Sequence, residues 1–116
     1  YGAGCAYKEA NERIGTALGN IFTTKKIYIH SDLLAAARAM CGNEEGIACI
    51  MGTGSNSCLY NGKEIVENTP PLGYILGDEG SGANLGRQFV SDCVKKQLPK
   101  EITEAFMAKY TKLSIF

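Results

Sequence analysis

Three short stretches of the sequence carry residues that could do chemistry. The first, MGTGSNS at residues 51–57, sets the hydroxyls of Thr53 and Ser55 among glycines. Glycines at 52 and 54 let a turn bring its backbone N–H groups close to an anion, and the two hydroxyls add donors in the same place. The stretch fits a phosphate cradle, or a tight hairpin that needs glycine for its own dihedral angles. It has neither the Gly-Lys-Ser/Thr of a P-loop nor the spacing of a dinucleotide-binding fingerprint.

Asp32 is the second candidate. It follows KIYIH (residues 26–30), an alternating stretch that predicts a short strand, and it opens the helix-forming run at residues 33–41. The carboxyl end of a strand is a common place for chemistry in α/β folds because it faces a crevice. A carboxylate there could accept a proton from a bound hydroxyl. Aspartate is also a favoured helix N-cap, so a structural role stays open.

The third stretch, LGDEGSGANLG at residues 76–86, places Asp78 and Glu79 before a predicted helix. The helix dipole alone favours acids at this position, and Ser81 could cap the helix. A solvated cap does not need glycine on both sides, so the flanking glycines favour close approach of a ligand to the backbone. These glycines are Gly77, Gly80 and Gly82. Four other polar side chains are interpreted as structural, in the core or on the surface: His30, Cys49, Lys63 and Arg87.

The elements that must position these residues alternate between helix and strand. YGAGC at residues 1–5 fits the end of a strand, and helical spacing predicts a helix from Ala6 to about Gly19 or Asn20. The helix after Asp32 is expected to stop at Gly42. The pattern therefore predicts an α/β protein.

The second half of the chain predicts an antiparallel meander followed by helices. Its strands are expected at residues 47–51, 57–60 and 63–68, with a type I′ turn at Asn61-Gly62. Residues 72–76 fit another extended segment. Helices are expected from Ser81 and after Pro99.

Composition limits the class of protein. The 116 residues are 45% hydrophobic, enough for a core, and twelve Lys and Arg balance twelve Asp and Glu. No basic block marks a nucleic-acid surface. The longest uncharged apolar stretch, residues 47–51, is too short for a membrane span, and no signal-like segment opens the chain, so we expect a soluble, cytoplasmic protein. The five cysteines contain no C-x-x-C spacing, so reduced thiols and no metal site are expected.

Taken in order, HSDLLAAARA, IMGTGSN and PPLGYILGDEGSGANLG resemble motifs of the actin-like ATPase superfamily, which includes sugar kinases. The likeness is closest to N-acetylglucosamine kinases and BadF/BcrA-type ATPases, and it covers nearly the whole chain. The resemblance implies two ribonuclease-H-like domains with ATP and Mg²⁺ in the cleft between them. It assigns residues 1–41 to the end of the first domain, 42–46 to a hinge, and 47–116 to the start of the second domain.

The resemblance also implies roles for single residues. Asp32 matches the base that activates the acceptor hydroxyl. The residues that match the phosphate-binding hairpin are Gly52, Thr53, Gly54 and Ser55. Those that match the sugar-binding segment are Gly73, Asp78 and Glu79. The physical requirements of phosphoryl transfer agree, because the reaction depends on positioning and charge neutralisation around an activated hydroxyl.

Two departures from the family pattern shape the expectations. The family's first phosphate loop has no counterpart in the chain, and the adenosine-binding segment is expected beyond residue 116. We therefore expect the chain to be part of a longer kinase, inactive alone and self-associating through an uncovered face. Leu72 stands where N-acetylglucosamine kinases carry an aromatic residue, which leaves the acceptor sugar open.

Three functions are compatible with these motifs. The leading hypothesis is an ATP-dependent kinase for an amino sugar such as N-acetylglucosamine. The first alternative is an ATPase that drives a partner protein, with Cys49, three residues before Gly52, as ligand to a shared iron–sulfur cluster. The second alternative is a module without catalytic activity of its own.

Overall fold

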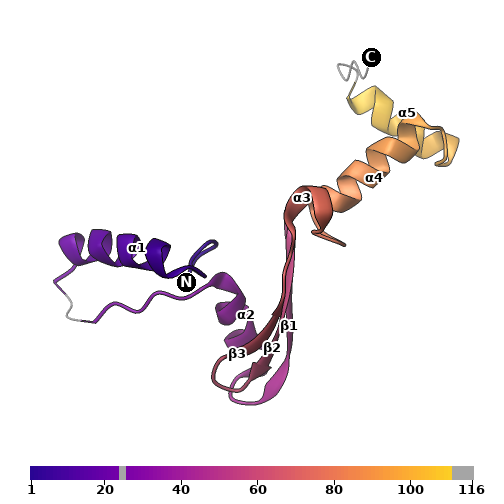
Figure 1. The fold of residues 1–116 in the computed structure, drawn as a ribbon. Helices are drawn as coiled ribbons and strands as arrows, with labels where there is room; N and C mark the ends of the chain where they lie inside the picture. The colour runs from indigo at the N-terminus through magenta and orange to yellow at the C-terminus, as the bar shows by residue number, and fades with distance from the viewer. Residues whose placement is uncertain (24–25, 111–116) are drawn as a thin grey trace.

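The computed structural model describes residues 1–23 and 26–110 as a mixed α/β chain (Figure 1). The elements in order are α1 (Lys8–Ile21), α2 (Asp32–Cys41), β1 (Glu45–Met51), β2 (Ser55–Asn61), β3 (Ile65–Thr69), α3 (Gly73–Leu76), α4 (Gly82–Val94) and α5 (Lys100–Lys109). The predicted helices after Ala6, Asp32, Ser81 and Pro99 are confirmed. The end of the predicted second domain, residues 111–116, lies outside the described residues.

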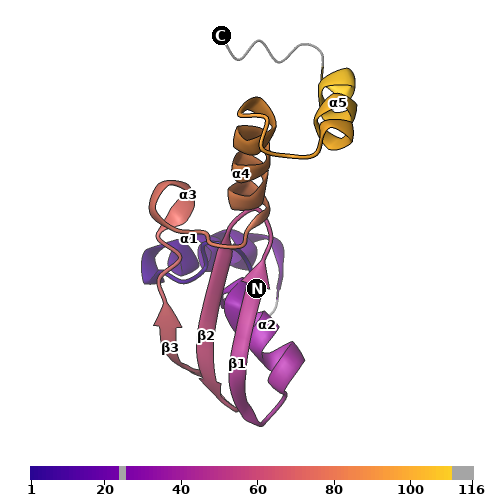
Figure 2. The ribbon, with the colours of Figure 1, turned by 90° about the vertical axis from the view of Figure 1, so that its right-hand side faces the viewer.

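The three strands form the predicted antiparallel meander, in the order β1-β2-β3 (Figure 2). One face of this sheet is covered by α2. Because side chains on a strand alternate between faces, Ala48 and Cys58, which pair across β1 and β2, both point toward α2. They form a buried cluster with Leu33 and Ala37 of α2 and with Tyr60. Burial raises the pKa of the Cys58 thiol, so the thiol stays protonated in the core.

Local signals set both ends of α2. The Ser31 hydroxyl oxygen accepts a hydrogen bond from the N–H of Leu34 (3.2 Å) and caps the start of the helix. Gly42 ends it with a φ of 62°, a conformation that favours glycine. Leu33 and Ala37 are one turn apart and meet the sheet together. Ala37 has no exposed surface, because its small side chain lets the helix lie close to the strands.

The core crosses the predicted boundary at residues 42–46. Residues 42–44 form a short turn, β1 begins at Glu45, and α2 packs directly on β1 and β2. The division of the chain into two domains stays a prediction, and in this structure α2 shares its core with the sheet.

The two strands predicted at residues 1–5 and 26–30 are not formed. A single parallel bridge joins Gly2 to Ser31, supported by a hydrogen bond from the N–H of Gly2 to the carbonyl of His30 (3.0 Å). One bridge makes no ladder, so both segments are extended without sheet pairing. The second segment lies along α1. A Cβ added to Gly15 would lie 3.5 Å from the Ile29 side chain, and one added to Gly19 would lie 3.9 Å from the Ile27 side chain.

Residues 72–76 were predicted to be extended, and that prediction is wrong. The short helix α3 forms there instead, after Leu72 and Gly73 turn the chain with φ of 56° and 71°. The N–H of Gly77 closes the helical turn on the carbonyl of Gly73 (2.8 Å), and the N–H of Asp78 closes the whole loop on the carbonyl of Pro71 (2.9 Å). These closing contacts, which periodicity does not reveal, select the helix.

The turn between β2 and β3 also differs from the prediction. A type I′ turn needs positive φ at both central residues, but only Gly62 has it (88°). The side chain of Asn61 instead accepts hydrogen bonds from the N–H groups of Lys63 (3.0 Å) and Glu64 (2.9 Å). Asparagine makes this side-chain turn readily, and it lengthens the connection.

The described chain is extended, with α4 and α5 reaching away from the sheet beyond the β1–β2 turn (Figures 1 and 2). The radius of gyration is 19.7 Å, whereas a compact chain of this length has about 13 Å. The accessible surface is 8990 Å², against about 6100 Å² for a compact protein of this mass. On the sheet face opposite α2, Ile47 and Met51 are 73% and 75% exposed. No helix in the described part of the chain is long and apolar enough to cross a membrane.

Candidate functional site

Asp32 is the first residue of α2, and its side chain does not cap the helix. The structure separates the two interpretations of this residue, because Ser31 rather than Asp32 provides the N-cap. One carboxylate oxygen, Oδ1, accepts a hydrogen bond from the N–H of Leu33 (2.9 Å). No described residue donates to the second oxygen. The carboxylate is therefore oriented by its own helix and keeps one acceptor available.

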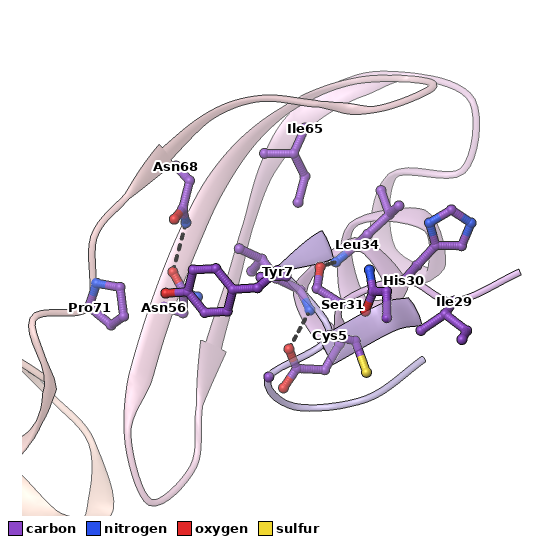
Figure 3. Close-up of a pocket in the computed structure, with 15 residues that line it drawn as sticks. Cys5, Tyr7, Ile29, His30, Ser31, Leu34, Asn56, Ile65, Asn68 and Pro71 are labelled. Atoms are coloured by element: carbon purple, nitrogen blue, oxygen red, sulfur yellow. Dashed lines mark hydrogen bonds between the residues drawn. The ribbon is translucent and has the colours of Figure 1, made fainter. Parts of the chain in front are cut away.

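Asp32 lines a cavity of about 540 Å³ between the N-terminal segments and the sheet (Figure 3). One wall comes from the starts of α1 and α2 and from the extended segment between them. The other wall comes from β2, β3 and Pro71, with Asn56 and Asn68 at its surface. Residues far apart in the sequence thus meet around one space, as the labelled side chains in Figure 3 show.

Asn56 lines this cavity and has a side-chain hydrogen-bond donor without a described partner. Its side-chain oxygen accepts from the N–H of Ser57 (2.9 Å) and from Nδ2 of Asn68 (2.8 Å), which fixes the amide orientation. Its own Nδ2 has no described acceptor. The cavity therefore has a free acceptor at Asp32 and a free donor at Asn56. A ligand hydroxyl can use both, because it donates one hydrogen bond and accepts others.

The sequence pattern does not mark Asn56 or Asn68 as site residues. The available signal is the position of Asn56, directly after the GTGS stretch and two residues from the buried Cys58 on β2. Alternation along the strand puts both side chains on the same face, the one that meets α2. Asn68 pairs with Cys58 from β3 and carries no comparable signal in the sequence.

The GTGS stretch forms the hairpin turn between β1 and β2. The N–H of Gly52 donates to the carbonyl of Gly54 (2.9 Å), and no described residue accepts from the N–H groups of Thr53 or Gly54. The carbonyls of Gly52 and Thr53 accept from Gly82 (2.8 Å) and Ala83 (3.3 Å) at the start of α4. The hairpin therefore binds α4 through its carbonyls and leaves two N–H donors free. The space beside Gly52 is open.

Asp78 lies against this hairpin. Its Oδ1 accepts from the N–H of Ser55 (3.1 Å), and a Cβ on Gly54 would lie 2.8 Å from the same oxygen. The carbonyl of Asp78 accepts from the N–H of Ser81 (3.0 Å). The backbone of Asp78 has a φ of 56°. Asp78 thus ties the hairpin to the start of α4. Because the N–H of Ser55 already donates to Asp78, this predicted phosphate-binding residue has only its hydroxyl left as a donor.

The glycines around the acids pack the chain against itself. A Cβ on Gly77 would fall far inside contact distance of the Pro71 carbonyl oxygen, and one on Gly82 would lie 3.2 Å from the carbonyl oxygen of Gly52. Gly80 has a φ of 74°, which a side chain would strain. Each of these glycines serves a turn or a close backbone contact, so the need for glycine is explained without a ligand, and close approach of a ligand stays a prediction.

The other predicted site residues lie outside the Asp32 cavity. Glu79 lines a second cavity of about 260 Å³, which shares Asn56 and Pro71 with the first. Gly73 begins α3 with open space around its Cβ position. Neither Gly73 nor Asp78 lines the cavity that holds Asp32.

Three of the side chains interpreted as structural can now be placed. Cys49 is exposed, so the interpretation of this residue as core is wrong: it points to the uncovered face of the sheet, opposite Ala48. His30 is half-buried and lines the cavity beside Asp32. The guanidinium of Arg87 lies 5.4 Å from the centre of the Tyr74 ring and links α4 to α3.

Comparison with solved structures finds matches that include one over nearly the whole chain. The crystal structure of the "putative N-acetylglucosamine kinase" from Porphyromonas gingivalis matches with a TM-score of 0.92 and 51% sequence identity. The chain is similar to part of that protein. The match covers 99% of this chain and 41% of that protein, so the chain spans less than half of the length of the protein it matches. No protein-family model and no curated protein matches the chain.

Proposed function

We propose that the protein containing this chain is an ATP-dependent sugar kinase that phosphorylates a hydroxyl of an amino sugar such as N-acetylglucosamine. The observation that carries the proposal is the cavity in which Asp32 offers a free acceptor and Asn56 a free donor. Such a pair suits a neutral ligand rich in hydroxyl groups. The 51% identity to a chain described as a kinase supports the same chemistry.

Asp32 is the proposed general base. Its Oδ1 accepts from the N–H of Leu33, so the other oxygen of this cavity-lining residue is left to accept the proton of a sugar hydroxyl. Loss of that proton leaves the sugar oxygen free to attack the γ-phosphorus of ATP, and ADP is the leaving group. Holding the hydroxyl between Asp32 and Asn56 would supply the alignment on which phosphoryl transfer depends.

The hairpin at residues 52–55 is the proposed phosphate contact. The free N–H groups of Thr53 and Gly54, together with the hydroxyls of Thr53 and Ser55, are donors of the kind that bind phosphate oxygens. The described residues contain no group of three or more His, Cys, Asp or Glu that could hold a metal. Mg²⁺ needs only one or two carboxylates beside the phosphates of a nucleotide, so we propose that it enters as magnesium–ATP.

The sugar-binding segment has two separate proposed roles. Glu79 adjoins the sugar cavity through the second cavity, which makes it the better placed of the two acids to contact the sugar. Direct contact of Asp78 and Gly73 with the sugar remains a prediction. Asp78 in any case holds the hairpin through the N–H of Ser55.

The wider organisation follows the sequence-based expectations and is likewise proposed. Residues 1–41 and 47–116 would belong to two ribonuclease-H-like domains of a longer cytoplasmic enzyme, joined at 42–46. The exposed sheet face with Ile47 and Met51 would be covered by further chain or by self-association.

The test is the variant Asp32→Asn in the full-length protein, assayed by coupled ADP release with magnesium–ATP. The sugars are N-acetylglucosamine, glucosamine and glucose. Loss of a general base should lower sugar-dependent kcat by about 10²- to 10⁴-fold. Asp92→Asn on α4 is the matched control, because Asp92 bonds Gln88 on its own helix and should leave kcat unchanged.

Two results would contradict the proposal. Wild-type activity in Asp32→Asn would remove the base assignment. ADP release by the wild type that ignores every sugar would instead favour the ATPase hypothesis, and an iron–sulfur absorbance in anaerobically purified protein would then implicate Cys49.

A further inference from the structure

The hairpin between β1 and β2 is held at three consecutive peptide units, two of them by α4. The carbonyl of Gly52 accepts from the N–H of Gly82 (2.8 Å), and the carbonyl of Thr53 accepts from the N–H of Ala83 (3.3 Å). In a trans peptide unit the carbonyl and the N–H point in opposite directions. Because both carbonyls bond the start of α4, the N–H groups of Thr53 and Gly54 point away from it. These are the two hairpin donors without a described acceptor.

The third peptide unit, between Gly54 and Ser55, is held by the side chain of Asp78. Its carbonyl accepts from the N–H of Gly52 within the hairpin (2.9 Å), and its N–H donates to Oδ1 of Asp78 (3.1 Å) in a part-buried bond. The three atoms nearest to a Cβ added on Gly54 would all belong to the Asp78 carboxylate, at 2.8–3.2 Å. The Asp78 side chain therefore joins this hairpin to the loop before α4.

We propose that Asp78 is a positioning residue for nucleotide binding, whose carboxylate holds the hairpin in the arrangement that presents the N–H groups of Thr53 and Gly54 to phosphate oxygens. The inference rests on the proposed function for the identity of the ligand. Without the contact to Ser55 the hairpin would occupy other arrangements as well, and the affinity falls with the fraction of molecules that can bind. In this role Asp78 acts through the hairpin and not by contact with the nucleotide.

The negative charge of Asp78 gives the proposal a distinctive sign. A carboxylate beside a phosphate site repels the phosphates, so removal of the charge alone should tighten nucleotide binding. Loss of the hairpin arrangement should weaken it. Asp78→Asn separates the two effects, because it removes the charge and keeps a side-chain oxygen that can accept from the N–H of Ser55.

The test is calorimetric titration of the full-length protein with magnesium and a non-hydrolysable ATP analogue, without sugar. Asp78→Ala should raise the dissociation constant about tenfold, whereas Asp78→Asn should stay within about twofold of the wild type. Gly54→Ala should resemble Asp78→Ala, because its methyl group displaces the carboxylate from the other side. In the double variant that methyl group meets no carboxylate, so the dissociation constant should equal that of Asp78→Ala alone.

Tyr60→Phe is the control for a general loss of stability. Tyr60 is buried near the other end of β2 from Ser55, and its hydroxyl donates to the carbonyl of Gly42 (3.3 Å). Removal of this hydroxyl should lower the thermal unfolding midpoint and leave the hairpin in place, so nucleotide affinity should stay at the wild-type value. Gly54→Ala carries the test if Asp78→Ala does not fold.

Several results would overturn the inference. Wild-type or tighter nucleotide binding in Asp78→Ala and Gly54→Ala would do so, and so would equal losses in Asp78→Ala and Asp78→Asn, which would assign the effect to the charge. A loss in Tyr60→Phe as large as that in Asp78→Ala would assign it to stability. The expected pattern without sugar-dependent ADP release would support the inference and refute the kinase. A wild type that binds no nucleotide would refute both.

Discussion

Asp32 and Asp78 each lie within three residues of a serine that caps a helix, yet the two carboxylates make different contacts. Asp32 follows its cap, Ser31, and its carboxylate bonds only its own helix at the edge of a cavity. Asp78 precedes its cap, Ser81, and its carboxylate holds the N–H of Ser55 on a separate hairpin. An acid that follows the N-cap residue can keep its carboxylate available for chemistry. An acid in the loop that precedes the N-cap residue can use its carboxylate to join that loop to a neighbouring segment.

The strongest way to break the Asp78 region is Gly77→Ala. The new methyl group would collide with the Pro71 carbonyl, so the loop that Asp78 closes must open. Overpacking against backbone of this kind should lower the free energy of unfolding by about 3 kcal/mol. The measurement is urea unfolding of the full-length protein. Gly86→Ala on α4 is the control: nothing surrounds its Cβ position, and it should be neutral or stabilise by up to about 1 kcal/mol.

Removing each carboxylate in turn tests the comparison directly. Asp78→Ala should cost about 1.5–3 kcal/mol, because it deletes a hydrogen bond to a charged group and leaves the part-buried N–H of Ser55 without a partner. Asp32→Ala should cost less than about 1 kcal/mol, because Ser31 still caps the helix. Chemical denaturation of both variants gives the difference. Equal losses would show that Asp32 is as structural as Asp78.

The two caps provide the smallest and most precise test. Ser81 has no exposed surface and bonds the N–H of Asn84 (3.1 Å), whereas Ser31 is half-buried. Ser81→Ala should therefore cost about 2 kcal/mol and Ser31→Ala about 1 kcal/mol, the range measured for lost caps. Denaturation midpoints at equal m-value would resolve the two. The reverse order would mean that burial does not set the strength of these caps.

The helices and the meander could be predicted because their signals are local. Apolar spacing, caps and helix-forming residues predicted α1, α2, α4 and α5, and an apolar run followed by short segments between glycine-containing turns predicted the meander. The segment at residues 72–76 failed because its conformation depends on hydrogen bonds from Gly77 and Asp78 that close only in three dimensions. The strand predicted at residues 26–30 is not formed because its alternating pattern is present but no described strand pairs with it.

Cys49 shows a limit of another kind. The run IACIM is apolar at every position, so alternation establishes two faces and does not say which one is covered. Packing of Ala37 on Ala48 decides it and leaves Ile47, Cys49 and Met51 on the open face. A sequence cannot make this choice without the helix that lies against the strand.

For the candidate site, the sequence by itself determined that a carboxylate would open α2 at Asp32 and that a glycine hairpin would follow at residues 52–54, because caps, turns and helix spacing act over a few residues. Only the tertiary structure decided that Asn11 and Asn56 share a cavity with Asp32, and that Asp78 is bound to the hairpin. These outcomes depend on contacts between segments more than twenty residues apart, as the 23-residue separation of Ser55 and Asp78 illustrates. Such contacts form only when the folded chain packs segments that are distant in the sequence against one another.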